Sequence, residues 1–365
     1  MLFALTNRPC LGVDIGSYSI KLALVKKTKR GYELANFGMI PLPPDAIVER
    51  EVENPGAVSD TLKNLMAAEK VPSSIKNCAF SVSGQSVIIK KITVPLMSED
   101  DLAESIQQEA EQYIPFDIDE VNVDFQIVKH EGPIPKKGQK LPENEDRQMD
   151  VLLVAVKKDV LGEQAEILKN AGLKPSVADL DVFALENGYE AAYGLDADDT
   201  VALVNIGASI TNVNIIENGI TAYTRDIPMG GNKISETIQK NMNVPFKEAE
   251  KYKLGVFEGG LRREQVIPHL KAGLAAICDE LKKTFDMYHR TSESRVRRVR
   301  VCGGTAMIEG VETIMGQELG LSCELINPFR NIKVNTKVFD PEYIEKIAPM
   351  AVVAVGLAIR RLGDK

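Results

Sequence analysis

A short polar turn between two apolar segments carries the kinds of residue that bind phosphate. The flanking segments are typical of the two strands of a β-hairpin, so the polar residues would lie at its tip. Gly16 would take backbone angles that a side chain forbids and would let a phosphate come close, while Lys21 supplies a point charge. Asp14 is placed to face a metal ion through water. The residues of this turn are Asp14, Gly16, Ser17, Tyr18, Ser19 and Lys21.

A surface hairpin with a merely polar tip is the alternative, because short glycine motifs occur widely. A second stretch favours the phosphate interpretation. Residues 204–216 repeat the layout of strand, polar residue, Ile-Gly, small polar tip and strand, with Asn205 in the place of Asp14. Such a duplication predicts two similar lobes that each offer a hairpin to one cleft. The second tip consists of Gly207, Ala208 and Ser209.

A third glycine turn follows the apolar segment 299–302, and it would let a base or a ribose lie against bare backbone. Three such elements in this order resemble the two phosphate loops and the adenosine loop of the actin-like ATPase superfamily. The resemblance covers nearly the whole chain. It implies an α/β, two-lobed actin-like (ribonuclease H-like) fold with ATP and Mg²⁺ between the lobes. The residues of the third turn are Gly303, Gly304 and Thr305.

The same resemblance assigns roles to further residues. Asp181, at the start of a helix, would face the γ-phosphate as the candidate catalytic residue, although an acid that merely starts a helix explains it equally well. Glu250 would take the ribose hydroxyls and Lys253 would flank the base, with a solvated charged helix face as the alternative. Asn205 is a further candidate near the metal. The turn before another helix adds Gly230, Gly231 and Lys233.

Composition narrows the class of protein. The 365 residues are enough for two to four domains. The net charge of −8 argues against nucleic acid as the main partner, and the basic run 295–300 alternates with valine like one solvated face of a strand. The five cysteines and three histidines are scattered, so they indicate reduced thiols in the cytoplasm and no zinc site.

Neither end of the chain predicts a membrane segment. Residues 1–8 are too short and too little basic for a signal peptide. The apolar run 347–359 includes Pro349, and a buried helix packed on the lobe that holds Asp14 explains it better than a membrane anchor. We therefore expect a cytoplasmic protein.

An inserted domain is predicted at residues 85–156. Residues 87–95 are typical of a strand, and Ser98 can cap the helix that follows, whose first turn is acidic. Two further strands follow at 120–128 and 151–156, with a polar loop between them at 132–140. This order of strand, helix, strand and strand makes a compact βαββ (SHS2-like) domain.

The insertion resembles that of the bacterial division protein FtsA. The amino-acid sequence of residues 92–99, 109–116 and 119–125 resembles that of the PilM family of FtsA-like type IV pilus assembly proteins. FtsA itself fits less well, because its C-terminal linker and amphipathic helix are not seen here. The predicted domains are a first lobe at 1–84 and 157–198 with the C-terminal helix 342–365, the insert at 85–156, and a second lobe at 199–341.

The resemblance implies a cytoplasmic ATP-binding scaffold for type IV pilus assembly and twitching motility. It would dock the N-terminal cytoplasmic tail of PilN, contact other motor and platform proteins, and reach the inner membrane only through partners. An FtsA-like filament-forming ATPase and a sugar-kinase-like phosphotransferase are the alternatives, and self-association stays open. In actin-like enzymes an aspartate usually stands where this chain has Asn205. An amide cannot take a proton, so we expect slow or absent ATP hydrolysis, which Asn205→Asp would raise.

Overall fold

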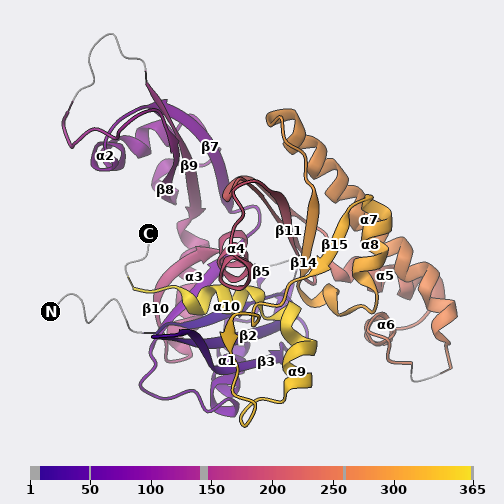
Figure 1. Ribbon diagram of the computed structural model, residues 1–365. Helices are drawn as coiled ribbons and strands as arrows, with labels where there is room; N and C mark the ends of the chain where they lie inside the picture. The colour runs from indigo at the N-terminus through magenta and orange to yellow at the C-terminus, as the bar shows by residue number, and fades with distance from the viewer. Residues whose placement is uncertain (1–8, 49–50, 140–146, 258–259, 363–365) are drawn as a thin grey trace. The chain divides into compact units, whose positions relative to one another are not determined.

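The computed structural model describes residues 9–48, 51–139, 147–257 and 260–362 (Figure 1). The predictions made for residues 1–8, and for the end of the C-terminal helix at 363–365, lie outside these ranges. The chain divides into two compact units, one of Met1–Ser81 with Ile167–Lys365 and one of Val82–Glu166. The second unit contains the predicted insert.

A six-stranded sheet forms one side of the larger unit. Its first hairpin pairs β1 with β2 in antiparallel register, and β6 runs parallel to β1 on the other side. Successive residues of the two central strands are buried along most of their length, so both faces of these strands are covered. The strand order across the sheet is β10 (Lys174–Leu180), β6 (Asn77–Val82), β1 (Leu11–Ile15), β2 (Ser19–Thr28), β3 (Gly31–Pro41) and β16 (Ile332–Lys333).

A five-stranded sheet repeats this pattern. Here β11 and β12 form the hairpin, β13 continues it in antiparallel register, and β14 runs parallel to β11 as β6 does to β1. The duplication expected from the two hairpins is thus present in the strand topology. The order is β13 (Ile220–Ile227), β12 (Thr211–Glu217), β11 (Thr200–Ile206), β14 (Arg298–Cys302) and β15 (Ser322–Leu325).

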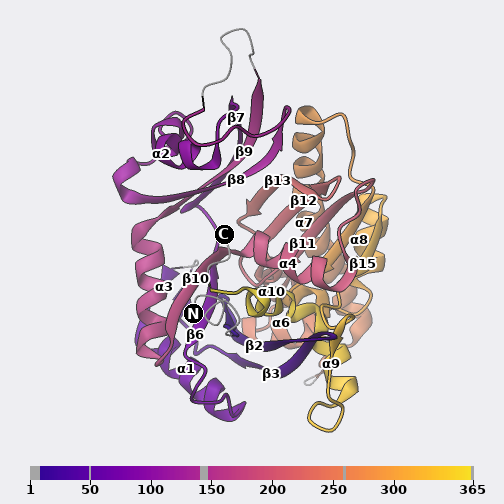
Figure 2. The same cartoon turned by 60° about the vertical axis from the view of Figure 1, so that its left-hand side comes forward.

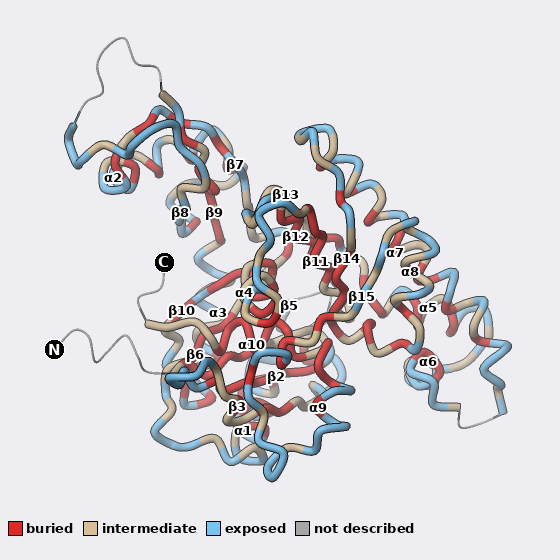
Figure 3. The backbone as a smooth tube through the Cα atoms, viewed as in Figure 1, coloured by how far each residue is buried: buried red, intermediate tan, exposed pale blue. Residues whose placement is uncertain are grey.

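Two helices, α4 (Asp181–Tyr193) and α10 (Val352–Ile359), lie between the two sheets (Figure 2). They cross at glycines. A Cβ built on Gly188 would lie 2.6 Å from the carbonyl oxygen of Val352, and one on Gly356 would overlap the carbonyl oxygen of Ala184. Every residue from Val352 to Ala358 is buried (Figure 3). The apolar run 347–359 is therefore a core element, as predicted.

The outer face of the five-stranded sheet is covered by helices that share one apolar core with it. The helix α7 begins at Arg263 and continues through Pro268 to Thr291. The covering elements are α5 (Gly231–Met242), α6 (Phe246–Lys253), α7 (Arg263–Thr291), α8 (Val311–Leu319) and the short helix η3 (Gly304–Met307). The remaining elements of the larger unit include α1 (Pro55–Ala68), α9 (Pro341–Ile347), η4 (Ala348–Met350), β4 (Ile47–Val48) and β5 (Glu51–Val52), and α3 (Lys158–Asn170) runs from one unit into the other.

The smaller unit has the predicted order of strand, helix, strand and strand. Ser98 accepts a hydrogen bond from the backbone N–H of Asp101 and so caps the helix, as expected. The helix packs Leu102, Ile106 and Ala110 against one face of an antiparallel sheet in which β9 is central. The elements are β7 (Val87–Pro95), α2 (Glu99–Ala110), η2 (Ile118–Glu120), β8 (Val121–His130) and β9 (Gln148–Lys157).

The basic run 295–300 is only in part the solvated strand face that its alternation predicted, because Arg295 and Arg297 are exposed but Arg298 and Arg300 are not. Arg300 is buried and forms an ion pair with Glu324, while its guanidinium lies 5.3 Å from the centre of the Tyr193 ring. Arg298 forms an ion pair with Asp199. Both charges are therefore used inside the fold. Among the helices in the described ranges, none combines the length and the apolar character needed to cross a membrane.

Candidate functional site

The tip of the first hairpin holds an ion pair. Asp14 and Lys21 are cross-strand neighbours, and Lys21 Nζ lies 2.9 Å from Asp14 Oδ2 with both side chains largely buried. A Cβ built on Gly16 would lie 3.8 Å from Lys21 Nζ and 4.0 Å from Asp14 Oδ1, so the bare side of this glycine faces the pair. The prediction that Gly16 takes backbone angles forbidden to other residues is wrong, because its φ is not positive. The glycine gives room rather than an unusual conformation.

The other residues of this tip differ in exposure. Ser19 is buried as the first residue of β2, Ser17 is half-buried, and Tyr18 is 51% exposed. The backbone N–H of Gly16 donates to the carbonyl oxygen of Ser19, with 3.1 Å between the two atoms, and this bond closes the tip. The Ser17 and Lys21 side chains are thus less exposed than the ring of Tyr18.

Asp181 meets the same edge of the sheet. It is the first residue of α4, and its carboxylate accepts a hydrogen bond of 2.6 Å from the hydroxyl of Ser81. In the pairing of β1 with β6, Val13 lies opposite Phe80, so Ser81 comes level with Asp14. The predicted catalytic acid thus lies on the strand edge that carries the first hairpin tip.

The second hairpin tip packs against the turn before α5. The backbone N–H of Gly231 donates to the carbonyl oxygen of Gly207 at 2.8 Å, and that of Asn232 donates to Ala208 at 2.8 Å. A Cβ on Gly230 would lie 2.6 Å from the oxygen of Gly207. The close approach of these two backbones therefore requires glycine at position 230.

The third glycine turn completes this cluster. Gly303 has a φ of +94°, and a Cβ there would lie 2.5 Å from Asn205 Oδ1. A Cβ on Gly304 would meet nothing within 4 Å, so one side of this residue is open. The hydroxyl of Thr305 donates to the carbonyl oxygen of Gly207 over 3.3 Å. The predicted adenosine turn and the second phosphate hairpin are thus in direct contact.

Glu250 and Lys253 lie inside this cluster. Their side chains are 16% and 7% exposed, and Lys253 Nζ lies 2.6 Å from Glu250 Oε1. The lysine also donates to the carbonyl oxygen of Gly231 over 3.2 Å, and the hydroxyl of Ser235 donates to Glu250. The alternative of a solvated helix face is therefore wrong. Lys233, by contrast, is exposed on the first turn of α5 and is not brought into the cluster.

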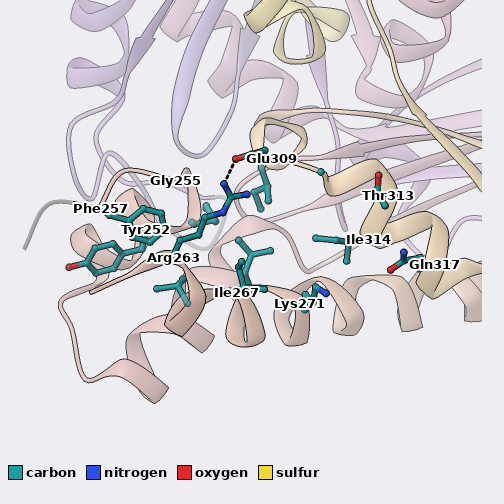
Figure 4. Close-up of a pocket in the computed structure, with 15 residues that line it drawn as sticks. Tyr252, Gly255, Phe257, Arg263, Ile267, Lys271, Glu309, Thr313, Ile314 and Gln317 are labelled. Atoms are coloured by element: carbon teal, nitrogen blue, oxygen red, sulfur yellow. Dashed lines mark ion pairs between the residues drawn. The ribbon is translucent and has the colours of Figure 1, made fainter. Parts of the chain in front are cut away.

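A cavity of about 400 Å³ opens beside Lys253 (Figure 4). Its wall is mostly apolar and is built from α6, the first turns of α7 and the start of α8. At one side the guanidinium of Arg263 lies 2.8 Å from the carboxylate of Glu309. The lining residues include Tyr252, Lys253, Phe257, Ile267, Gly310 and Ile314.

The thiol of Cys302 lies beside the second hairpin. Its Sγ lies 3.7 Å from Asn205 Oδ1. Burial raises the pKa of the Cys302 thiol, the ammonium of Lys21 lowers it, and the carboxylate of Asp14 raises it further. The pKa of the Cys302 thiol thus responds to the charged pair of the first hairpin tip.

The metal prediction can be compared with the chemistry of these side chains. In the described part of the chain no three His, Cys, Asp or Glu residues gather in a way that could hold a metal ion. Mg²⁺ usually needs fewer protein ligands, because it keeps several waters and binds the phosphates of its nucleotide. The carboxylate of Asp14 and the amide oxygen of Asn205 are the hard oxygen groups that suit it.

A family model for type IV pilus assembly protein PilM matches residues 12–362. The chain belongs to the PilM family. A chain of the solved PilM-PilN type IV pilus biogenesis complex is 25% identical, with a TM-score of 0.82 over 97% of this chain and 98% of that one. The α/β actin-like fold, including its inserted βαββ unit, is thereby confirmed.

Curated relatives outside the PilM family match shorter stretches. The ethanolamine utilization protein EutJ of Salmonella typhimurium is 28% identical over 141 residues, which is 38% of this chain and 46% of EutJ. The cell division protein FtsA of Bacillus subtilis is 27% identical over 106 residues, 29% of this chain and 24% of FtsA. The match therefore spans less than half of the length of either relative, and it places the PilM family beside FtsA-like proteins.

Sequence reasoning missed several residues of the site. The partner of Asp181, Ser81, was not singled out, and neither was the cavity beside Lys253. A weak signal did exist for Asn212 and Asn214. The two amides alternate with apolar residues in a strand that is buried almost throughout. Which side chain each amide contacts depends on the register with neighbouring strands, and no local pattern reveals that.

Proposed function

We propose that this protein is an ATP-binding scaffold of the type IV pilus assembly platform and docks the N-terminal cytoplasmic tail of PilN. The observation that carries the proposal is the similarity, along almost the whole of both chains, to a chain of a PilM-PilN complex. Through PilN and other platform or motor proteins it would lie at the inner membrane on the cytoplasmic side.

Three features support ATP as its ligand. The two hairpin tips offer backbone N–H groups, small hydroxyls and the ammonium of Lys21 to an anion. Gly230 and Gly303 allow close approach of backbones where a Cβ would collide. The open side of Gly304 leaves room for a flat group. Together these features would hold a triphosphate at one end and a nucleoside at the other.

The base would enter the cavity beside Lys253. Its apolar wall suits the faces of a purine, and its volume of about 400 Å³ is in the range of small-molecule pockets. Glu250 would accept from ribose hydroxyls, since its carboxylate is held by Ser235 and by Lys253, which lines the cavity. Release and mass identification of the small molecules that copurify with the protein tests this assignment directly.

Mg²⁺ would lie at the phosphate end of the nucleotide site, where Asp14 and Asn205 would accept hydrogen bonds from waters bound to the ion. Bound there, the ion would neutralise phosphate charge. Among the described residues, Asp14 supplies a carboxylate to the metal at this point, and Asp181 is a second acid that could orient a water. Little is therefore available to activate that water, and slow or absent turnover is expected.

The smaller unit is the proposed docking domain. Its central strand is β9, so β7 and β8 are the outer strands to which an extended tail could add. Lys90, Lys91 and Pro95 make β7 a poor template for a further strand. The strand β8 has no proline and alternates half-buried apolar side chains with exposed polar ones as far as Ile127. We therefore place the tail along β8.

Pull-down with a PilN tail peptide tests the docking proposal. The full chain should retain the peptide, and a chain that lacks residues 85–156 should lose it. ATP binding by the shortened chain serves as the folding control. Full retention of the peptide by a shortened chain that still binds ATP would move the docking site to another part of the protein.

A further inference from the structure

Four polar side chains lie side by side on four neighbouring strands, and we call them the polar ladder. They are directly opposite one another in register, from Cys302 on β14 through Asn205 on β11 and Asn212 on β12 to Asp226 on β13. Cys302 Sγ donates to Asn205 Oδ1 over 3.7 Å. Asn205 Nδ2 donates to Asn212 Oδ1 over 3.0 Å, and Asn212 Nδ2 donates to Asp226 Oδ1 over 2.8 Å.

The ladder has a direction, and Asp226 sets it. An ionised carboxylate can only accept hydrogen bonds, so Asn212 must turn its NH₂ group toward Asp226. Its oxygen then faces Asn205, which must donate its own NH₂ group in turn. The oxygen of Asn205 is thereby left on the side away from Asn212, where it also accepts from the thiol of Cys302. The orientations of both amides thus follow from the position of one acid rather than from a free choice between O and N.

Burial makes this direction costly to reverse. Asn212 is fully buried, so a turned amide would leave two polar groups unpaired. Strand alternation places the ladder on the face of the sheet opposite Ala202, Val204 and Val213, which pack into the outer core. The ladder therefore faces the side of the sheet on which α4 and the cleft lie.

The first hairpin has the same register with different chemistry. There Asp14 lies between Lys21 on β2 and the level of Ser81 on β6, just as Asn205 lies between Asn212 and Cys302. The second lobe thus has no acid at the tip of its hairpin, from Asn205 to Asn212. Its nearest acid in register is Asp226, two strands away from Asn205.

We infer that Asp226 is a positioning residue that orients the Asn205 amide, so that Asn205 presents an oxygen toward the cleft where Mg²⁺ and the ATP phosphates would lie. This role rests on the proposed nucleotide site. Waters on Mg²⁺ donate hydrogen bonds, so an oxygen at this position suits them and an NH₂ group does not. Asp226 acts through Asn212 and touches neither the metal nor the nucleotide.

The ladder also changes what Asn205→Asp should do. An aspartate at 205 would compete with Asp226 for the one NH₂ group of Asn212, so one of the two carboxylates would lose its hydrogen bond from Asn212. Exchanging both ends, Asn205→Asp with Asp226→Asn, restores a complete ladder of the opposite direction. The acid then lies on the hairpin, as Asp14 does in the first lobe.

The experiment compares the wild type with Asn205→Asp, Asp226→Asn and the double exchange, first by thermal unfolding without nucleotide. Asn205→Asp should lower the Tm by about 3 °C or more, and the double exchange should recover at least half of that loss. A control of the same net charge, Asn205→Asp with Asp286→Asn at an exposed position of α7, should recover none. Simple additivity in the double exchange would overturn the inference.

Calorimetric ATP binding with Mg²⁺ and with EDTA gives the second measurement. Asp226→Asn should reduce the gain in affinity due to Mg²⁺ by about three- to tenfold, and the double exchange should restore it. A full Mg²⁺ gain in Asp226→Asn would overturn the positioning role. A wild type that binds no ATP would instead overturn the proposed function and this role with it, while the unfolding data would still judge the direction of the ladder.

Discussion

Replacing Lys21 by methionine removes the ammonium at the first hairpin tip and keeps most of the side-chain length. A charge-assisted hydrogen bond to phosphate contributes about 1.5–3 kcal/mol. Loss of this bond should weaken ATP binding by about 10- to 150-fold. The largest loss of affinity is expected in EDTA. In the wild type the carboxylate of Asp14 lies 2.9 Å from the ammonium of Lys21. Without that ammonium and without Mg²⁺, its negative charge would face the phosphates directly.

The double variant Asp14→Asn with Lys21→Met separates the two causes. In EDTA it should bind ATP more tightly than Lys21→Met alone, because the unpaired negative charge is gone. Lys26→Met is the matched control, since Lys26 lies exposed farther along the same strand. Isothermal titration calorimetry measures all four proteins. Binding by Lys21→Met within about twofold of the wild type, or equal loss in Lys26→Met, would refute the placement of phosphate at this tip.

Four further predictions concern other parts of the larger unit. ATP turnover, measured as steady-state phosphate release, should stay below about 1 per second, and a faster rate would contradict the weak water site. Ile267→Trp should fill the cavity and weaken ATP binding by at least about tenfold, whereas Ala272→Trp at an exposed position of α7 outside the cavity lining should leave it unchanged in the same calorimetry. Gly356→Ala should destabilise the protein by about 3 kcal/mol or more in denaturant titration, because its Cβ has no space at Ala184; a variant of normal stability would show that α4 and α10 can separate. Burial raises the pKa of Glu186 above 4.5, so its stabilising effect is complete below pH 4.5 and is lost as the pH rises through the folded pKa. Glu186→Gln should therefore raise the Tm at pH 8 more than at pH 4.5, and an equal change at both pH values would contradict this assignment.

The parts of the fold that could be predicted depend on local patterns. Strand alternation and glycine predicted both hairpins, Ser98 predicted the start of α2, and the apolar run predicted the buried helix α10. These signals lie within a few residues of one another. The division of the larger unit into lobes at residue 198, and the nucleotide roles assigned to single residues, stay predictions.

The rest depends on contacts between distant segments. Lys253 and Glu250 look like solvated charges in the sequence, because nothing near them shows that α6 packs over Gly231. The basic run around Arg300 was misjudged for the same reason, since its partners Glu324 and Tyr193 come from other elements. Likewise, the partner of Asn212 depends on strand register, which long-range packing sets.

The position of α10 also has a consequence for how the protein is made. Gly12 of β1 has no room for a Cβ because the backbone of α10 at Ala354 and Ala358 fills that space. At translation rates of roughly 5 to 20 residues per second, the ribosome would produce this helix about 20 to 70 seconds after β1. During that interval one apolar face of the first sheet has no native cover. The nascent chain therefore depends on chaperones or provisional packing there, while the locally connected unit Val82–Glu166 can fold earlier.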